Sequence, residues 1–236
     1  VHFQIIKSNK ETINGECNKT YVLEQEDQID ILATKQSAYG YMGLEGGFDV
    51  KHFCKSVSIL SRAQIGPNKG KKIKVDDKIN IKINSKNIKN FYAKVPKKNE
   101  NTIRVLKGPQ FDYFSEESQK YFFSKEYKIS NLTDRMGMRL EGAIMKNIVD
   151  TNIRSEGITK GAIQVPADGQ PIILLTDYPT IGGYPKIANV ISADYNLLIQ
   201  KTPGEKISFK LIKLHEAEQL YKEHLNSISE IIKNIK

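Results

Sequence analysis

The sequence of 236 residues has two cysteines, four histidines and no tryptophan. Cys17 and Cys54 are too few, and too unpatterned, for a disulfide framework or a zinc site. The histidines show neither the HxH nor the HExxH spacing, so we predict no bound metal in this chain. The GxxxxGK[ST] phosphate loop and the GxSxG nucleophile motif are also missing, which argues against a P-loop enzyme and a serine hydrolase.

Long apolar runs are missing as well. No run approaches the roughly 20 residues of a membrane helix, and the first residues lack the pattern of a secretory signal. We therefore expect a cytoplasmic protein without membrane contact. The net charge of +9 could favour nucleic acid, but only five of the 36 basic residues are arginine, the residue that best reads bases and grips phosphates. No nucleic-acid partner is expected.

Short apolar runs separated by turn residues predict a mainly β fold with few helices. Between His2 and Asn84, segments such as FQII, IDIL and KINIKI have the composition of short strands. Another strand is predicted at Ile207–Ile212. Short helices are predicted at Ser115–Phe123, with Ser115 as the N-cap, and from Ser192 to Gln200.

The end of the chain and its middle differ from this β pattern. From Leu214 onward, apolar residues recur at helical spacing and predict an amphipathic helix that packs on the β structure or binds a partner. Residues 85–100 are rich in lysine and asparagine and are weakly patterned. We place the boundary between two halves, 1–100 and 101–236, in this segment.

The most informative stretch runs from Arg154 to Ala188. Ala162–Val165 and Pro171–Thr176 are predicted strands, and the turn Pro166–Gly169 joins them because proline fixes φ and glycine allows a positive φ. The two strands would deliver polar side chains to one end of a sheet. We interpret this stretch as the wall of a binding pocket.

Two carboxylates and two amides of this stretch are candidate site residues. Glu156 and Asp168 are the candidate acid–base groups, although Asp168 would equally serve as a turn carboxylate bonded to its own backbone. Gln164 and Gln170 are neutral donor–acceptor groups that suit an amide such as urea or a lactam. Simple polarity at a sheet edge would also explain both glutamines.

The segment DRMGMRLEG offers two of the few arginines together with an acid. Alternate residues of a strand point the same way, so Arg135, Arg139 and Glu141 would share one face. The two guanidinium groups could then grip a carboxylate or phosphate while Glu141 orients one of them. A structural ion-pair ladder is the alternative.

The corner GGYPK combines backbone N–H groups with a phenol and an ammonium. Gly182 and Gly183 could form an anion-binding nest, with Tyr184 beside it and Lys186 neutralising a phosphate or carboxylate. A tight β corner with a solvated lysine is the alternative. Together these residues predict a polar pocket for a ligand with an amide or carboxylate, and they do not identify a reaction by themselves.

Three segments, DRMGMRLEG (134–142), SEGITKGAIQVPADGQPIILLTD (155–177) and GGYPKIANVISADYNLL (182–198), resemble the KipA or allophanate-hydrolase-subunit-2 family. YGYMGLEGGFDV (39–50) and IRVLKGPQFDYF (103–114) resemble it more weakly. That family includes the C subunit of the bacterial 5-oxoprolinase and the carboxyltransferase region of urea carboxylase. Its members usually carry a further N-terminal segment with a Gln-Asp-Xaa-Gly-Arg motif, which this sequence does not show.

The resemblance implies two cyclophilin-like β-barrel subdomains, at 1–100 and 101–236, the second followed by the C-terminal helix. It implies the C subunit of an ATP-dependent 5-oxoprolinase, a lactam hydrolase active only in complex, which converts 5-oxo-L-proline to L-glutamate. The partners would be the KipI-like B subunit together with the lactam-utilisation A subunit, with ATP bound at the level of the complex.

The resemblance also suggests roles for the candidate residues. Arg135 and Arg139 would hold the substrate carboxylate or a phosphate, Glu156 or Asp168 would transfer protons, and Lys186 with the two glycines would offset phosphoryl charge. Two alternatives remain open. One is a carboxyltransferase acting on urea- or allophanate-like amides, which the lack of a fused biotin carboxylase disfavours; the other is a regulatory protein that binds a KipI-like kinase inhibitor.

Overall fold

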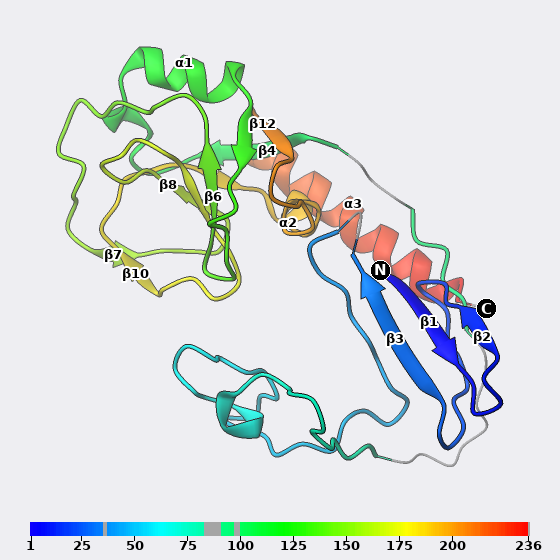
Figure 1. Ribbon diagram of the computed structural model, residues 1–236. Coiled ribbons are helices and arrows are strands. Elements are labelled where there is room, and N and C mark those ends of the chain that lie inside the picture. Colours follow the sequence, from blue (N-terminus) through cyan, green and yellow to red (C-terminus); the bar gives the residue numbers. More distant parts are fainter. Residues whose placement is uncertain (35–36, 83–90, 97–99, 236) are drawn as a thin grey trace. The chain divides into compact units, whose positions relative to one another are not determined.

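The computed structural model describes residues 1–34, 37–82, 91–96 and 100–235, and it is mainly β (Figure 1). The chain divides into two compact units, one made of residues 1–39 together with 90–236 and the other made of residues 40–89. Much of the predicted boundary segment, 85–100, lies outside the described residues. The predicted division into halves at residue 100 stays a prediction.

The first strands form a small antiparallel sheet in the order β2-β1-β3. Its strands are β1 (His2–Ile6), β2 (Thr12–Asn14) and β3 (Gln28–Ala33), so the predicted strands FQII and IDIL are confirmed. Ile5 of β1 is only 1% exposed and faces Ile13 and Ile29 across the sheet. A barrel in this part of the chain stays a prediction.

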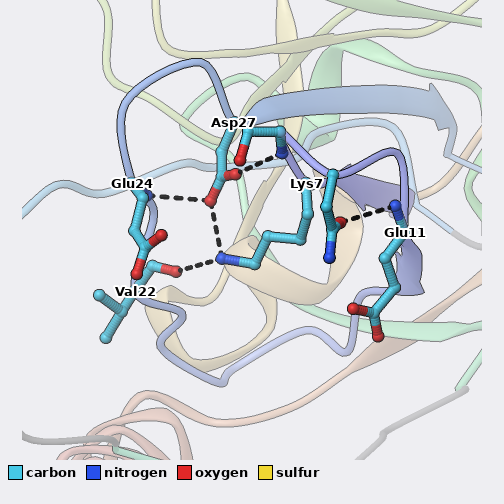
Figure 2. Close-up of polar contacts among 7 residues, drawn as sticks. Lys7, Glu11, Val22, Glu24 and Asp27 are labelled. Carbon is cyan, nitrogen blue, oxygen red and sulfur yellow. Dashed lines mark hydrogen bonds and ion pairs between the residues drawn. The ribbon is translucent and has the colours of Figure 1, made fainter.

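Asp27, just before β3, connects the turn after β1 to the loop that leads into β3 (Figure 2). Its buried carboxylate accepts hydrogen bonds from Lys7 Nζ (2.7 Å), the Glu24 N–H (2.9 Å) and the Ser8 N–H (3.0 Å). Lys7 Nζ also donates to the Val22 carbonyl at 3.3 Å. The Glu24 N–H and then Lys7 hold the pKa of the Asp27 carboxyl below its usual value of 3.8.

Replacing Asp27 with alanine should loosen this end of the sheet. The Ser8 and Glu24 amide protons then lose their acceptor, so their hydrogen exchange should become faster at neutral pH. NMR-detected exchange measures this, with Asp30→Ala on β3 as the control because Asp30 is exposed. Unchanged exchange at both amides would contradict the role of Asp27. Because its pKa is lowered, the carboxyl stabilises the fold above pH 3.8, and this contribution disappears as the pH falls further.

The unit of residues 40–89 is described from residue 40 to residue 82. A short 3-10 helix, Pro67–Gly70, and isolated bridges such as Phe48 with Ile81 are its regular features. The segment KINIKI was predicted as a strand, but its described residues pair with the chain only around that bridge, through Asn80 O and the Lys82 N–H. The pairing is too short for a strand, and the described isoleucines, Ile79 and Ile81, are exposed.

Seven strands of the second half close into a barrel (Figure 1). In chain order they are β4 (Thr102–Lys107), β5 (Tyr127–Ile129), β6 (Gly137–Glu141), β8 (Ala162–Gln164), β9 (Ile172–Leu174), β11 (Lys186–Val190) and β12 (Lys206–Leu211). Around the barrel the order is β11-β4-β12-β5-β6-β9-β8, and β8 pairs with β11 to close it. All pairs are antiparallel except β4 with β12, which are parallel. The predicted strands around residues 162–176 and 207–212 are confirmed.

Alternate residues of these strands fill the barrel. The buried interior side chains include Ile103, Val105, Met138, Leu140, Ile163, Ile173 and Ile207. Helix α1 (Glu116–Ser124) packs against the barrel through Phe122, whose ring stacks on Phe209 with centroids 4.5 Å apart. Each fully buried side chain of this kind contributes about 1.5–3 kcal/mol through the removal of apolar surface from water.

The predicted helices are all present. Ser115 caps α1 as expected, because its Oγ accepts the Ser118 N–H at 3.2 Å. Helix α2 (Ser192–Leu198) follows β11 and ends two residues before the predicted end. The mainly β fold with a C-terminal helix is confirmed. Among the described residues, no helix has the length and apolar character needed to cross a membrane.

The C-terminal helix α3 (Leu214–Lys233) packs on the barrel through its first turns. Ala217 is buried against Ile191 and Ile212, and Leu220 is partly buried beside them. Packing on the β structure is therefore confirmed for the start of the helix. The later apolar residues of the helix, Leu225, Ile228 and Ile232, are exposed. Partner binding by this later part stays a prediction.

Candidate functional site

A two-stranded ribbon lies against one wall of the barrel. It pairs β7 (Glu156–Gly157) with β10 (Ile181–Gly182), so that Gly182 is opposite Glu156. In the wall, Gln164 of β8 is opposite Lys186 of β11. Because Ile163 points into the core, Gln164 points to the other face of the strand. A Cβ on Gly182 would lie only 2.7 Å from Gln164 Nε2, so ribbon and wall are in direct contact.

Glu156 and Lys186 form the charged centre of this site. Lys186 is only 4% exposed, and its Nζ forms an ion pair with Glu156 Oε1. Gln110 Nε2 donates to the same carboxylate oxygen at 2.8 Å. The paired Lys186 side chain, and then the hydrogen bond from Gln110, hold the pKa of the Glu156 carboxyl below its usual value of 4.5. Glu156 is therefore ionised at neutral pH and faces a buried ammonium.

Gln164 contributes an unused hydrogen-bond donor. Its Nε2 is buried, and no acceptor for it exists among the described residues. A buried amide N–H without an acceptor costs about 1–3 kcal/mol, so a ligand oxygen bound here would remove that cost. The site thus combines an amide donor, an ammonium and a carboxylate. These groups can bind a carbonyl oxygen, offset negative charge on it and accept a proton.

The sequence-predicted residues Glu156, Gln164, Gly182 and Lys186 are thus brought together. Gly183 adjoins them: its carbonyl accepts the Ile153 N–H at 2.9 Å, and a Cβ at Gly183 would lie 3.1 Å from Ile153 O. Neither glycine has a positive φ, which an anion-binding nest of alternating conformations requires. The predicted nest is therefore not formed, and close approach of the ribbon explains Gly182 instead.

Lys186 is not the solvated lysine of the alternative interpretation, since it is buried. Tyr184, two residues earlier, is 41% exposed at the corner between β10 and β11. Its phenol is therefore accessible to a ligand or a partner. Its predicted role in binding stays a prediction.

Asp168 and Gln170 lie in the turn between β8 and β9, and their recorded contacts are structural. Asp168 Oδ1 accepts the Gln170 N–H at 3.0 Å, as a turn carboxylate does. The Gln170 side chain pairs with the backbone of Gly142, accepting its N–H at 2.9 Å and donating to its carbonyl at 3.3 Å. These bonds tie the turn to the end of β6. Neither side chain is recorded in contact with Glu156 or Lys186.

Arg139 and Glu141 share one face of β6, but Arg135 does not lie in that strand. Arg135 precedes β6 and pairs with Asp177, with Nε 2.9 Å from Oδ2 and Nη2 3.1 Å from Oδ1. Arg139 and Glu141 are exposed on the outside of β6. Among the described residues, Glu141 is not seen to orient an arginine. Arg135 instead forms a structural ion pair with Asp177.

The bend before β6 explains this error. Asp134 Oδ1 accepts the N–H groups of Met136 and Gly137, at 2.8 and 3.0 Å, and turns the chain out of strand geometry. Gln110 was not predicted as a site residue. The one available signal was its place in the segment IRVLKGPQFDYF, which resembles the family.

The donor groups of the described residues decide whether a metal or a phosphate could bind. They contain no group of three or more histidine, cysteine or acidic side chains that could hold a metal. Without a nest at Gly182 and Gly183, Lys186 is the one group of the site suited to a phosphate. The site therefore fits a carbonyl-bearing ligand better than a nucleoside triphosphate.

Replacing Gly182 with alanine should disturb the site and leave the fold intact. The new methyl group would displace the Gln164 amide, which is the end of a flexible side chain. Gly157→Ala, on the other strand of the same ribbon, is the matched control, because nothing lies within 4 Å of its Cβ position. We expect ligand binding or activity to fall about tenfold or more in Gly182→Ala only. Equal effects in both variants would contradict the prediction.

Comparison with known protein families gives an extended match. The model of the family described as "Carboxyltransferase domain, subdomain A and B" matches residues 6–211. The C subunit of the 5-oxoprolinase of Haemophilus influenzae is 35% identical over 207 residues, which are 86% of this chain and 67% of that protein. The corresponding C subunit of Escherichia coli is also 35% identical, over 79% of this chain and 61% of that protein. The chain thus spans about two thirds of these relatives.

Solved structures show the same fold. The crystal structure of the Kluyveromyces lactis urea carboxylase matches 98% of this chain and 23% of its own, with a TM-score of 0.83 and 24% sequence identity. At that identity the match supports the architecture alone. It includes the small N-terminal sheet as well as the barrel, since nearly the whole chain is covered.

Proposed function

Since the chain belongs to the family of the carboxyltransferase domain, subdomains A and B, we propose that it acts as the C subunit of a 5-oxoprolinase. The support from relatives is the 35% identity with two proteins of that name. The structural observation that carries the proposal is the buried, unpaired Gln164 amide beside the Lys186–Glu156 pair. The substrate would be 5-oxo-L-proline, a lactam whose carbonyl oxygen suits this donor.

In this proposal the three side chains divide the chemistry of ring opening. Gln164 Nε2 donates to the lactam oxygen, and Lys186 offsets the negative charge that develops on it. Glu156, kept ionised by its low pKa, accepts the proton of the attacking water. Water adds across the lactam C–N bond, so the carbonyl becomes a carboxylate and the ring nitrogen becomes the amine of L-glutamate.

The reaction would depend on ATP and on the assembled complex. ATP transfers its γ-phosphoryl group to the lactam oxygen and leaves as ADP, which makes the lactam carbon more electrophilic. The first water then opens the ring and leaves an acyl phosphate, and a second water releases phosphate from it to give L-glutamate. We place nucleotide binding on the two partners, the KipI-like protein and the lactam-utilisation protein, and the complex in the cytoplasm. Lys186 is the residue of this chain that would meet the phosphoryl charge.

The test is glutamate formation from 5-oxo-L-proline and ATP. This chain alone, the two partners without it, and all three proteins together are compared. We expect glutamate only in the full mixture. If size-exclusion chromatography shows the complex and no glutamate forms, the proposal is wrong, and a regulatory role or another amide substrate becomes the better explanation.

A carboxyltransferase acting on urea-like amides is the second candidate. The family model and the architecture shared with urea carboxylase are compatible with this candidate. The same polar groups could bind the carbonyl of urea. Supplying urea with a carboxybiotin donor in place of 5-oxoproline and ATP distinguishes the two, since a carboxyltransferase would consume carboxybiotin without forming glutamate.

A further inference from the structure

We propose that Gln110 is a positioning residue of this site, which holds the Glu156 carboxylate and the Lys186 backbone in fixed register. The chemical use of this register rests on the proposed function, in which Lys186 turns toward the ligand and Glu156 accepts a proton. The hydrogen bonds themselves do not depend on that function.

The Gln110 side chain bridges the two charged residues. Its Nε2 donates to Glu156 Oε1 at 2.8 Å, and its Oε1 accepts the Lys186 N–H at 3.2 Å. The Gln110 N–H also donates to the Lys186 carbonyl, at 3.3 Å. Gln110 is 8% exposed, so water does not replace these bonds easily. An amide is required here, because one end must donate and the other must accept.

The backbone that carries Gln110 is itself fixed. Gly108, at the end of β4, donates its N–H to the Ile187 carbonyl at 2.9 Å, and a Cβ on Gly108 would lie 2.2 Å from Lys186 O. The turn therefore packs directly on the irregular part of β11, where its pairing with β8 shifts between Lys186 and Ala188. Gln110 thus reaches the site from a rigid support.

Two groups meet at one oxygen of Glu156, the Lys186 ammonium through an ion pair and the Gln110 amide through a hydrogen bond, and they differ in charge. In the described part of the chain, Lys186 is the only charged side chain that pairs with Glu156. If a ligand oxygen draws the ammonium away, Gln110 still holds the carboxylate in its orientation. Loss of Gln110 should therefore act mainly on turnover, because the carboxylate would rotate at the step in which it is needed.

The experiment compares Gln110→Met, which has a similar volume and no amide, with Gln110→Glu, which keeps the length. Gln28→Met, at an exposed position of β3, is the control. Carbon-detected NMR of the full chain follows the titration of the Glu156 carboxyl. We expect its pKa to rise in Gln110→Met and to rise further in Gln110→Glu, where a second carboxylate replaces the donor. The control should match the wild type.

The second readout is the rate of glutamate formation by the mixture of all three proteins. We expect kcat of Gln110→Met to fall about 10- to 100-fold with KM changed little. A Glu156 titration that does not move in either variant would overturn the proposal, and so would a loss that appears in KM alone. The NMR readout needs neither partners nor substrate, so it decides on Gln110 even if the wild-type mixture forms no glutamate.

Discussion

Replacing Lys186 with methionine is expected to lower the kcat of glutamate formation by the proposed three-protein mixture about 100- to 1,000-fold. In the proposed function, the buried ammonium of Lys186 offsets the developing negative charge. Among the described residues, no other basic side chain pairs with Glu156. Methionine has a similar length and lacks the charge. Steady-state kinetics of glutamate formation measures the loss.

The fold should survive this change. Glu156 is 43% exposed in its side chain, so water can solvate it when its partner is removed. Because the ion pair lowers the pKa of Glu156, it stabilises the protein above pH 4.5 and is lost as the pH falls below that value. Stability of Lys186→Met should therefore depend less on pH in the acidic range. Lys210→Met, on the exposed side of β12, is the control, and equal losses of activity in both variants would refute the assignment.

Replacing Arg104 with methionine should lower the free energy of unfolding by about 3–5 kcal/mol. Arg104 of β4 forms an ion pair with Asp194 of α2. Its backbone N–H donates to Oδ2 at 2.8 Å, and its Nε donates to the same oxygen at 2.9 Å. The Asp194 side chain is only 4% exposed, so the variant would leave a buried carboxylate without its cation. Thermal unfolding should shift downward by roughly 6–20 °C.

Two further variants make this prediction specific. Arg135→Met removes an arginine whose side chain is 56% exposed beside Asp177, and exposed pairs contribute only about 0–1 kcal/mol. The double variant Arg104→Met with Asp194→Leu should recover much of the lost stability, because no unpaired charge remains. If Arg135→Met destabilised the protein as much as Arg104→Met, burial of the carboxylate would not be the cause.

Local signals in the sequence were sufficient for much of the fold and for part of the site. Ser115 before two acidic residues predicted the start of α1, because the N-cap is a local interaction. The turn at Pro166–Gly169 predicted the β8–β9 hairpin for the same reason. Glu156, Gln164 and Lys186 were found because they fall within one stretch whose short strands pair with one another. The matches to relatives confirm the resemblance on which the family assignment was based.

The residues that were missed depend on distant partners. Gln110 is 46 residues from Glu156, and Arg104 is 90 residues from Asp194, so neither pair has a spacing that a strand or helix period would reveal. Arg135 was misplaced for a local reason, the turn at Asp134, which competes with the alternating pattern of the strand. Burial also could not be foreseen for Lys186. It follows from the ribbon and the 108–110 turn, which cover β11 from different parts of the chain.

The parallel pairing of β4 with β12 has a consequence for how the protein is made. Thr102 and Ser208 are partners in this pair although 106 residues separate them, and β12 also pairs with β5. On the ribosome, the barrel cannot close until residue 211 has left the exit tunnel. Until then β4 and β5 each present an open edge that invites aggregation. A translating chain should therefore depend on chaperone protection longest at its β4 and β5 edges, and stalling before residue 206 should trap it there.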